Sequence, residues 1–221
     1  MFIMRNWSML AGTRSFNVLV GAAGGTDAPA DFRYAFERAV KECEAAGFAG
    51  SNIVRSRIWA RDSATRQIAS NVRLEMLAGA RRAASASFIA SERMPPSIDL
   101  IADIVAFDGG EKIIREYEPA IAPPMFVKLG GFVFLSGNTD VSATFDEQLE
   151  VILSKISRSL EVAGTAWAKI VKVDAYVAQS IDLASAWSEI SARFPCPVAM
   201  TSVEGYSAPE KLVEIEVTAL Q

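Results

Sequence analysis

The chain has 221 residues, of which 51% are hydrophobic and 22% charged, a balance typical of a folded protein with a substantial core. Its net charge of −4 at pH 7 provides no broad cationic surface, which argues against nucleic-acid binding. No segment approaches the roughly 20 apolar residues of a membrane span, and the opening MFIMRNWSML is too short and interrupted for a secretory signal. We therefore expect a cytoplasmic protein without membrane or nucleic-acid partners.

Histidine is absent from the sequence. Its absence excludes every mechanism that needs imidazole as a base, a proton shuttle or a metal ligand. We expect neither a metal site nor a cofactor. The two cysteines, Cys43 and Cys196, lie far apart in the sequence, and lone cysteines in a reducing compartment are most often buried thiols.

The first half of the chain alternates strand and helix patterns. An amphipathic helix is predicted at DFRYAFERAVKECEAAG (31–47), and a second helix at SATRQIASNVRLEMLAG (63–79). Strands are predicted at FNVLVGAAGG (16–25), NIVRSRIWARD (52–62), ASASFIA (84–90) and IDLIADIVAF (98–107). The predicted order of elements is β-α-β-α-β-β.

The second half repeats this order. Helices are predicted at FDEQLEVILSKISRSLEVAG (145–164), where apolar residues recur at three- and four-residue spacing, and at DLASAWSEISARF (182–194). Strands are predicted at GFVFLSG (131–137), IVKVDAYVA (170–178), PVAMTSV (197–203) and LVEIEVTAL (212–220).

Two dipeptides mark the repetition. The dipeptide Ala46-Gly47 recurs as Ala163-Gly164, and the dipeptide Ile-Val at 53–54 recurs at 170–171, with the same separation along the chain. The shared offset indicates a tandem duplication. We expect one domain at 1–107, a polar linker at 108–118 and a second domain at 119–221.

The second half resembles the RidA/YjgF family of small trimeric reactive-intermediate deaminases. The segment PAIAPPMFVKLGGFVFLSGNTD (119–140) is similar to the family's opening segment, and EVAGTAWAKIVKVDAYV (161–177) to its central helix end and strand. PVAMTSVEG followed by LVEIEVTAL looks like its closing signature. The first half resembles the family more weakly, mainly through the order of its elements.

The resemblance implies an α+β fold of two tandem RidA/YjgF-like (chorismate mutase-like) β-α-β-α-β-β domains. Each would be a mixed sheet with two helices on one face, and family members assemble three sheets around a barrel with clefts between neighbours. Because the second face of each sheet needs a partner, we expect a homo-oligomer, with a trimer of two-domain chains favoured.

The chain departs from the family at its functional residues. The resemblance implies an arginine that binds the substrate carboxylate on the penultimate strand, but Met200 stands there, and Ser85 in the first copy. A glutamate that positions the attacking water is kept as Glu214, whereas the first copy has Ile101. Trp187 replaces the family's helix asparagine. Standard imine hydrolysis of a small amino-acid derivative is therefore not expected.

Glu214 is the predicted catalytic residue. It alternates with Val213 and Ile215, so it points to the face opposite the helices, and apolar neighbours such as Met200 and Trp187 would raise its pKa and favour a general base. The alternative is a solvated or ion-paired strand carboxylate. We also predict three substrate-binding positions beside it, which are the turn residues Ser136 and Gly137, and Cys196.

A second candidate group lies on the strand 52–62. Arg55, Arg57 and Trp59 share one strand face, where an arginine would bind an anion and the indole would stack on a planar ligand. The alternative is a structural ion-pair network at the oligomer interface, with acids such as Asp99 and Asp103.

Two functions remain open from the sequence. The first is a divergent RidA-like enzyme, hydrolase or deaminase-like, that acts on a small planar or aromatic metabolite by hydrolytic or acid/base chemistry in an inter-domain cleft. The second is a small-molecule-binding or assembly protein on the same scaffold without chemistry.

Overall fold

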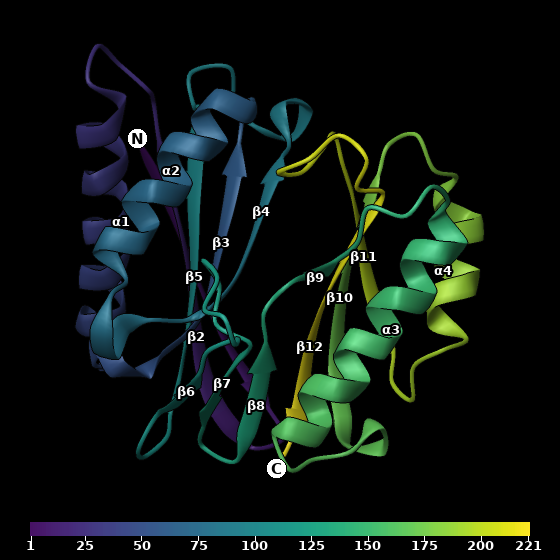
Figure 1. Cartoon of the computed structure of the whole chain (residues 1–221). Coiled ribbons are helices and arrows are strands. Elements are labelled where there is room, and N and C mark those ends of the chain that lie inside the picture. The colour runs from purple at the N-terminus through teal and green to yellow at the C-terminus, as the bar shows by residue number, and fades with distance from the viewer.

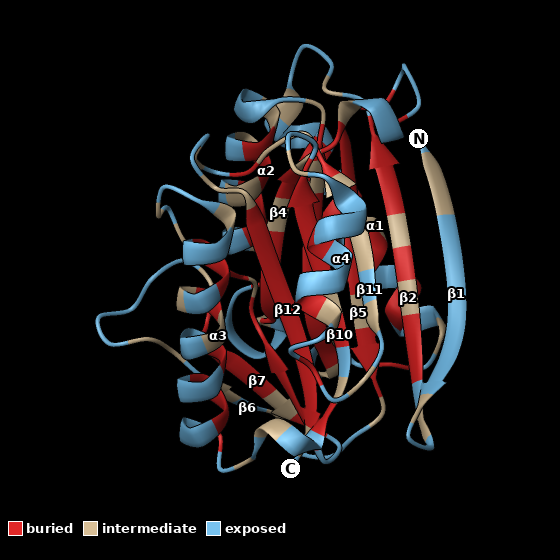
Figure 2. Ribbon diagram, turned by 90° about the vertical axis from the view of Figure 1, so that its right-hand side faces the viewer, coloured by how far each residue is buried: buried red, intermediate tan, exposed pale blue.

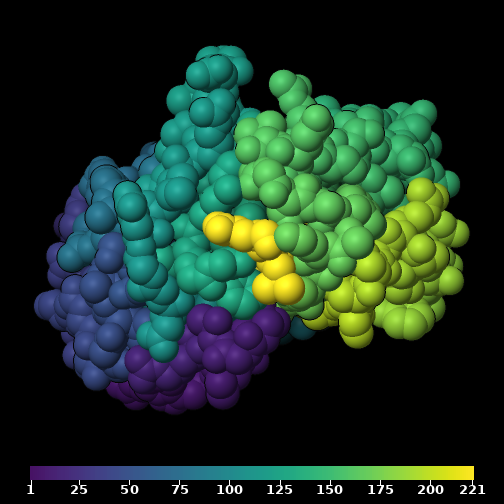
Figure 3. Space-filling model, turned by 90° about the horizontal axis from the view of Figure 1, so that it is seen from below, coloured from purple at the N-terminus to yellow at the C-terminus, as the bar shows by residue number.

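The computed structural model describes residues 1–221, which form two β-sheets with two α-helices on the outer side of each (Figure 1). The inner faces of the two sheets lie against each other. Seen from below, the C-terminal end of the chain lies at the junction between the two halves (Figure 3). None of the helices is both long and apolar enough to cross a membrane.

The first sheet has the strand order β1-β2-β5-β3-β4. Its strands are β1 (Phe2–Leu10), β2 (Thr13–Ala22), β3 (Ile53–Ala60), β4 (Ala84–Ile89) and β5 (Leu100–Phe107). Its helices are α1 (Ala28–Ala45) and α2 (Ser63–Met76). Only β3 and β4 run parallel, so the sheet is mixed. Both helices begin after an aspartate, Asp27 or Asp62, whose side chain accepts a backbone N–H of the first turn.

The second sheet has the strand order β11-β10-β12-β8-β7-β6, and β9 pairs with β12. Its strands are β6 (Ile113–Arg115), β7 (Phe126–Leu129), β8 (Phe132–Leu135), β9 (Asn138–Thr139), β10 (Ile170–Ala178), β11 (Val198–Val203) and β12 (Val213–Leu220). Its helices are α3 (Phe145–Val162) and α4 (Leu183–Ser191). Short 3-10 helices are η1 (Gly50–Asn52), η2 (Gly79–Arg81), η3 (Ser91–Arg93) and η4 (Trp167–Lys169).

The architecture confirms the predicted α+β class, with mixed sheets that each carry two helices on one face. Four strands were not predicted: β1, β6, β7 and β9. Residues 2–10 form the edge strand β1, whose polar residues hid the strand pattern, although Trp7 packs on Phe16 at 4.9 Å between ring centroids. The expected linker 108–118 contains β6, which pairs with β7 and so belongs to the second sheet. The domain boundaries themselves stay a prediction.

The two inner sheet faces bury each other within one chain. Phe107 of β5 contacts Phe132 and Phe134 of β8, with ring centroids 5.4 and 5.0 Å apart. Phe88 of β4 stacks on Tyr176 of β10 at 4.0 Å. Buried strands consequently fill the centre of the molecule (Figure 2). The need for a partner, which favoured a homotrimer, is met inside the chain, and the trimer stays a prediction.

Candidate functional site

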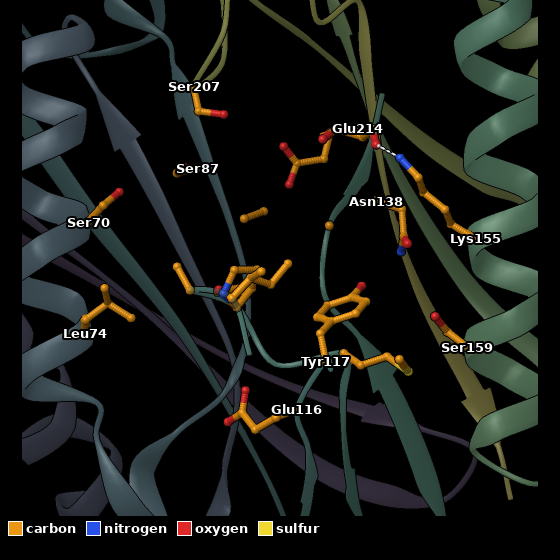
Figure 4. A pocket seen from close by; sticks show the side chains of 18 of the residues that line it. Ser70, Leu74, Ser87, Glu116, Tyr117, Asn138, Lys155, Ser159, Ser207 and Glu214 are labelled. Atoms are coloured by element: carbon orange, nitrogen blue, oxygen red, sulfur yellow. Dashed lines mark hydrogen bonds between the residues drawn. The ribbon is translucent and has the colours of Figure 1, made fainter. Parts of the chain in front are cut away.

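A cavity of about 790 Å³ lies between the two halves of the chain. Its walls come from α2 and β4 of the first half, from α3, β9 and the start of β12 in the second half, and from the segment 115–125 between β6 and β7. Figure 4 shows side chains from all these walls pointing into one space. The sequence placed a cleft between the two copies, and this cavity lies there.

Glu214 forms part of the wall on β12. The side chains of Val213 and Ile215 pack into the core beneath α3 and α4, so Glu214 points to the opposite face and into the cavity (Figure 4). The residue is only 6% exposed, and its carboxyl group forms no hydrogen bond with the rest of the chain. Burial, together with the negative charge of Glu216, raises the pKa of Glu214 to about 8. Its carboxyl group is therefore mostly protonated at neutral pH.

Gly137 leaves the space that this carboxyl group occupies. A Cβ atom at Gly137 would lie 1.7 Å from Oε1 of Glu214, far inside van der Waals contact. Glycine is therefore required here for a close approach between side chain and backbone. This close contact was not evident from the sequence, which only marked Gly137 as a turn residue.

We expect Gly137→Ala to displace the Glu214 carboxyl group while leaving the fold intact, because the glutamate side chain can rotate away. Its new position would be more hydrated, so the pKa of Glu214 should fall from about 8 toward the ordinary glutamate value. Carboxyl titration followed by NMR measures this change. An unaltered pKa in Gly137→Ala would contradict the contact.

Two buried arginines on α2 form the facing wall. Arg66 and Arg73 are 6% and 9% exposed, and neither forms an ion pair in the chain. Nη1 of Arg73 donates to the carbonyl oxygen of Ala86 at 2.7 Å, whereas Nε of Arg66 has no partner. Burial lowers the pKa of both, that of Arg73 to about 10. A buried cation without a counter-charge is costly, so this wall is suited to an anionic ligand.

The rest of the lining adds to the positive charge. Further cations on the walls are Arg115, Lys155, Arg158 and Lys211, and the acids are Glu116, Glu118 and Glu214. Of these, Lys155 forms an ion pair with Asp140 at 3.0 Å, and Glu116 forms one with Arg82. Because Glu214 is mostly protonated, the cavity carries a surplus of positive charge at neutral pH.

Ser136 and Gly137 connect the two halves beside the cavity. Oγ of Ser136 donates to the carbonyl oxygen of Pro124 at 2.6 Å and accepts the N–H of Ser85 at 3.1 Å. The N–H of Gly137 donates to the carbonyl oxygen of Ser85 at 3.1 Å. Gly137 and Ser85 line the cavity, but Ser136 is buried behind it. The predicted binding role of Ser136 is therefore corrected to a structural one.

Arg55, Arg57 and Trp59 do not line the cavity. Arg55 and Arg57 are buried and reach across the sheet interface to Glu216, at 2.8 and 2.7 Å. Arg57 also pairs with acids of both halves at 3.3 and 3.2 Å, and Nε1 of Trp59 donates to Asp103. The structure corrects the predicted anion and ring binding, because these groups are already paired. The contacts form an ion-pair network that includes Asp103, as in the alternative, but it joins the two sheets of one chain, whereas the alternative placed it at an oligomer interface.

Met200, Trp187 and Cys196 also lie outside the cavity. In the strand register Met200 pairs with Ala175, which pairs in turn with Ile215. Met200 therefore shares the face of Ile215 and packs against the core beneath α3 and α4, on the opposite face from Glu214. Trp187 is 53% exposed on α4, and Cys196 is half-buried against the same core. The expectation that all three surround Glu214 is wrong within the chain.

The cavity residues that sequence reasoning missed are chiefly Arg66, Arg73 and Tyr117. A signal for the first two was present. Together with Ala69 they recur at three- and four-residue spacing on the stripe of α2 that faces inward. Two arginines within the buried stripe of a helix indicate a polar site beneath it.

A sequence model of the family described as Endoribonuclease L-PSP matches residues 111–221, half of the chain. The chain belongs to this family, which confirms the resemblance to RidA/YjgF proteins. A family model that spans one half is consistent with a tandem duplication. No curated protein sequence matches the chain significantly.

One solved structure shares the fold of the whole chain, and smaller family members match about half of it. A crystal structure of a chorismatase matches with a TM-score of 0.68 and 16% identity, over 97% of this chain and 79% of that one. A YjgF/YER057c/UK114 family member from Mycobacterium tuberculosis matches with 27% identity and a TM-score of 0.43, over 50% of this chain and 100% of its own. A YjgF family member from Neisseria meningitidis gives 24% and 0.45, over 52% and 98%. The chorismatase likeness shows that the two-sheet arrangement recurs as a whole.

Proposed function

We propose that this L-PSP family member is an enzyme that acts on a small anionic metabolite in the cavity between its halves, by hydrolytic or acid/base chemistry. The observation that carries the proposal is the Glu214 carboxyl group, which is buried on the cavity wall, unpaired, and has a pKa of about 8. Perturbed titratable groups in a polar cavity are typical of catalytic sites.

The direction of the pKa shift favours a general acid for the first step, rather than the general base predicted from the sequence. A protonated Glu214 donates its proton to a leaving group or to a substrate oxygen or nitrogen. The carboxylate that results can then take a proton from an attacking water, which regenerates the acid. Glu214 alone can therefore donate the proton that the first step needs and take one back in the second, so hydrolysis does not require a histidine.

The cavity supports an anionic substrate. Arg66 has an unpaired Nε beside the cavity, and Arg73 has no carboxylate partner, so an anionic group on the substrate would supply the missing counter-charge. The predicted planar or aromatic character depended on Trp59 and Trp187, neither of which lines the cavity. Negative charge is therefore the property on which the proposal relies.

The experiment is a turnover screen of anionic metabolites. Chorismate is the first compound to test, because a chorismatase shares the fold, and enamine or imine derivatives of amino acids come next, because the family model matches. Turnover of a compound that also binds in the cavity supports the enzyme. Binding without turnover across the panel supports the alternative, a binding protein, which the loss of the strand arginine at Met200 and Ser85 favours.

For any substrate that is turned over, we expect kcat/KM to fall as the pH rises through about 8. Glu214 donates a proton only in its protonated form, and its pKa is about 8. Initial rates between pH 6 and 10 at subsaturating substrate measure the profile. A rate that stays level to pH 10, or that rises through pH 8, would contradict a general acid at Glu214.

A further inference from the structure

A strap of residues 116–124 crosses one side of the cavity. Its ends are fixed at the second sheet, because Arg115 pairs with Phe126 in the β6–β7 ladder and the N–H of Met125 donates to the carbonyl oxygen of Arg115 at 2.7 Å. The strap residues that line the cavity are Glu116, Tyr117, Glu118, Ile121, Ala122 and Pro123. The strap therefore forms a wall that neither sheet supplies.

Arg82, from the first half of the chain, bonds both the first residue of the strap and its later part. Its Nε and Nη2 bind both carboxylate oxygens of Glu116, the latter at 2.9 Å. Nη2 also donates to the carbonyl oxygens of Ala122 at 2.8 Å and Ile121 at 3.4 Å. No other side chain bonds the strap between Glu116 and Ala122. Bidentate arginine–carboxylate pairs fix geometry as well as contributing energy, so one guanidinium sets the position of the strap.

Tyr117 is the strap residue that reaches into the cavity. Figure 4 shows its ring pointing from the strap toward the side where Glu214 and Asn138 lie. It is the only aromatic residue of the lining, and its hydroxyl group bonds to no other group in the chain. Burial raises the pKa of this hydroxyl group, so at neutral pH it remains a hydrogen-bond donor.

We propose that Arg82 is a positioning residue that clamps the strap so that Tyr117 presents its ring and hydroxyl group to the substrate, across the cavity from Glu214. The inference rests on the proposed function, because it assigns this wall to the same site. The arginines of α2 suit the anionic part of the substrate. Tyr117 suits a neutral part, with the ring covering an apolar or planar surface and the O–H donating to an oxygen or nitrogen acceptor.

The test uses benzoate, a planar carboxylate, as the probe, and calorimetry or NMR titration to measure its affinity. We expect Tyr117→Ala to weaken benzoate binding about fivefold, which corresponds to about 1 kcal/mol, the usual contribution of an aromatic contact of this kind. Arg82→Gln, which does not line the cavity, should weaken it by a similar factor, and Glu116→Gln by less. Arg82→Lys, which keeps the charge, should recover part of the loss.

The double variant Tyr117→Ala/Arg82→Gln separates positioning from a general structural effect. If Arg82 acts through Tyr117, the double variant binds benzoate no more weakly than Tyr117→Ala alone. Hydrogen exchange should also show that the strap loses protection in Arg82→Gln. The matched control is Arg14→Gln, which removes another two-bond arginine–carboxylate pair, with Asp108 at 2.8 and 3.1 Å, outside the cavity.

Additive losses in the double variant, an unchanged affinity in Arg82→Gln, or failure of benzoate to bind the wild-type protein would each overturn the proposal. These outcomes are distinct from failure of the proposed function. Glu214→Gln should keep benzoate affinity and lose turnover, so full turnover by Glu214→Gln would reject the acid at Glu214 and leave the strap result standing.

Discussion

Glu214→Gln should lower kcat/KM by roughly a hundredfold or more, because a positioned general acid contributes about 10²–10⁴-fold. The amide has nearly the shape of the protonated carboxyl group and fits the same space over Gly137. It cannot transfer a proton at neutral pH. The measurement is steady-state kinetics on a substrate from the screen, with benzoate affinity as a test that the cavity is intact.

The matched control is Glu118→Gln, which changes another glutamate of the cavity lining. Glu118 is exposed and has no assigned proton-transfer role, so its rate should change only a few-fold. Comparable losses in the two variants would indicate that cavity charge matters and that Glu214 is not the acid. Full activity of Glu214→Gln would reject the assignment directly.

The stability of Glu214→Gln provides a second, independent measurement. The folded-state pKa of Glu214 is raised to about 8, above the value of about 4.3 expected in an unfolded chain. The native state therefore binds more protons between these values, and the contribution of Glu214 to the free energy of unfolding falls as the pH rises through this window. Glu214→Gln removes that loss, so above pH 8 it should melt at a higher temperature than wild type.

The fold was largely predictable because its signals are local. Period-two alternation located β10 and β12, and three- and four-residue spacing located α3. The edge strand β1 and the short strands β6, β7 and β9 were missed because none of them shows a run of alternating apolar and polar residues. Their pairing is set by neighbouring strands, which no short stretch of sequence records.

The site could be predicted only where the alternation of side chains along a single strand decides which face a residue occupies. Alternation placed Glu214 on the face opposite the helices, and the structure agrees. Met200 lies on the other face, because it is in register with Ala175 of β10 and through it with Ile215 of β12. That register depends on how the strands align in space, which the sequence of one strand does not reveal. Likewise, Arg55 and Arg57 form ion pairs with Glu216 across the sheet interface, and these residues are far apart in the chain. Side-chain partners across an interface cannot be deduced from one strand alone.

Glu216 is expected to be the most important single charge for stability. It is fully buried and lies between Arg55 at 2.8 Å and Arg57 at 2.7 Å, which come from the opposite sheet. It also accepts the hydroxyl group of Tyr176 at 3.1 Å. Burial alone would raise the pKa of Glu216, but the two guanidinium groups bring it below the ordinary glutamate value. The carboxylate therefore joins the two halves of the molecule as a buried anion.

Glu216→Gln should lower the free energy of unfolding by about 3–5 kcal/mol, because removing one partner leaves buried charges uncompensated. Urea denaturation at pH 7 measures the loss. The control is Glu150→Gln, which breaks an exposed pair with Arg193 and should cost at most about 1 kcal/mol.

Because the folded-state pKa of Glu216 is lowered, its contribution to stability is present above the unfolded value of about 4.3 and is lost as the pH falls through the folded value. Wild type should therefore lose its advantage over Glu216→Gln in acid, and equal stability of Glu216→Gln and Glu150→Gln at pH 7 would show that the buried network does not hold the sheets together.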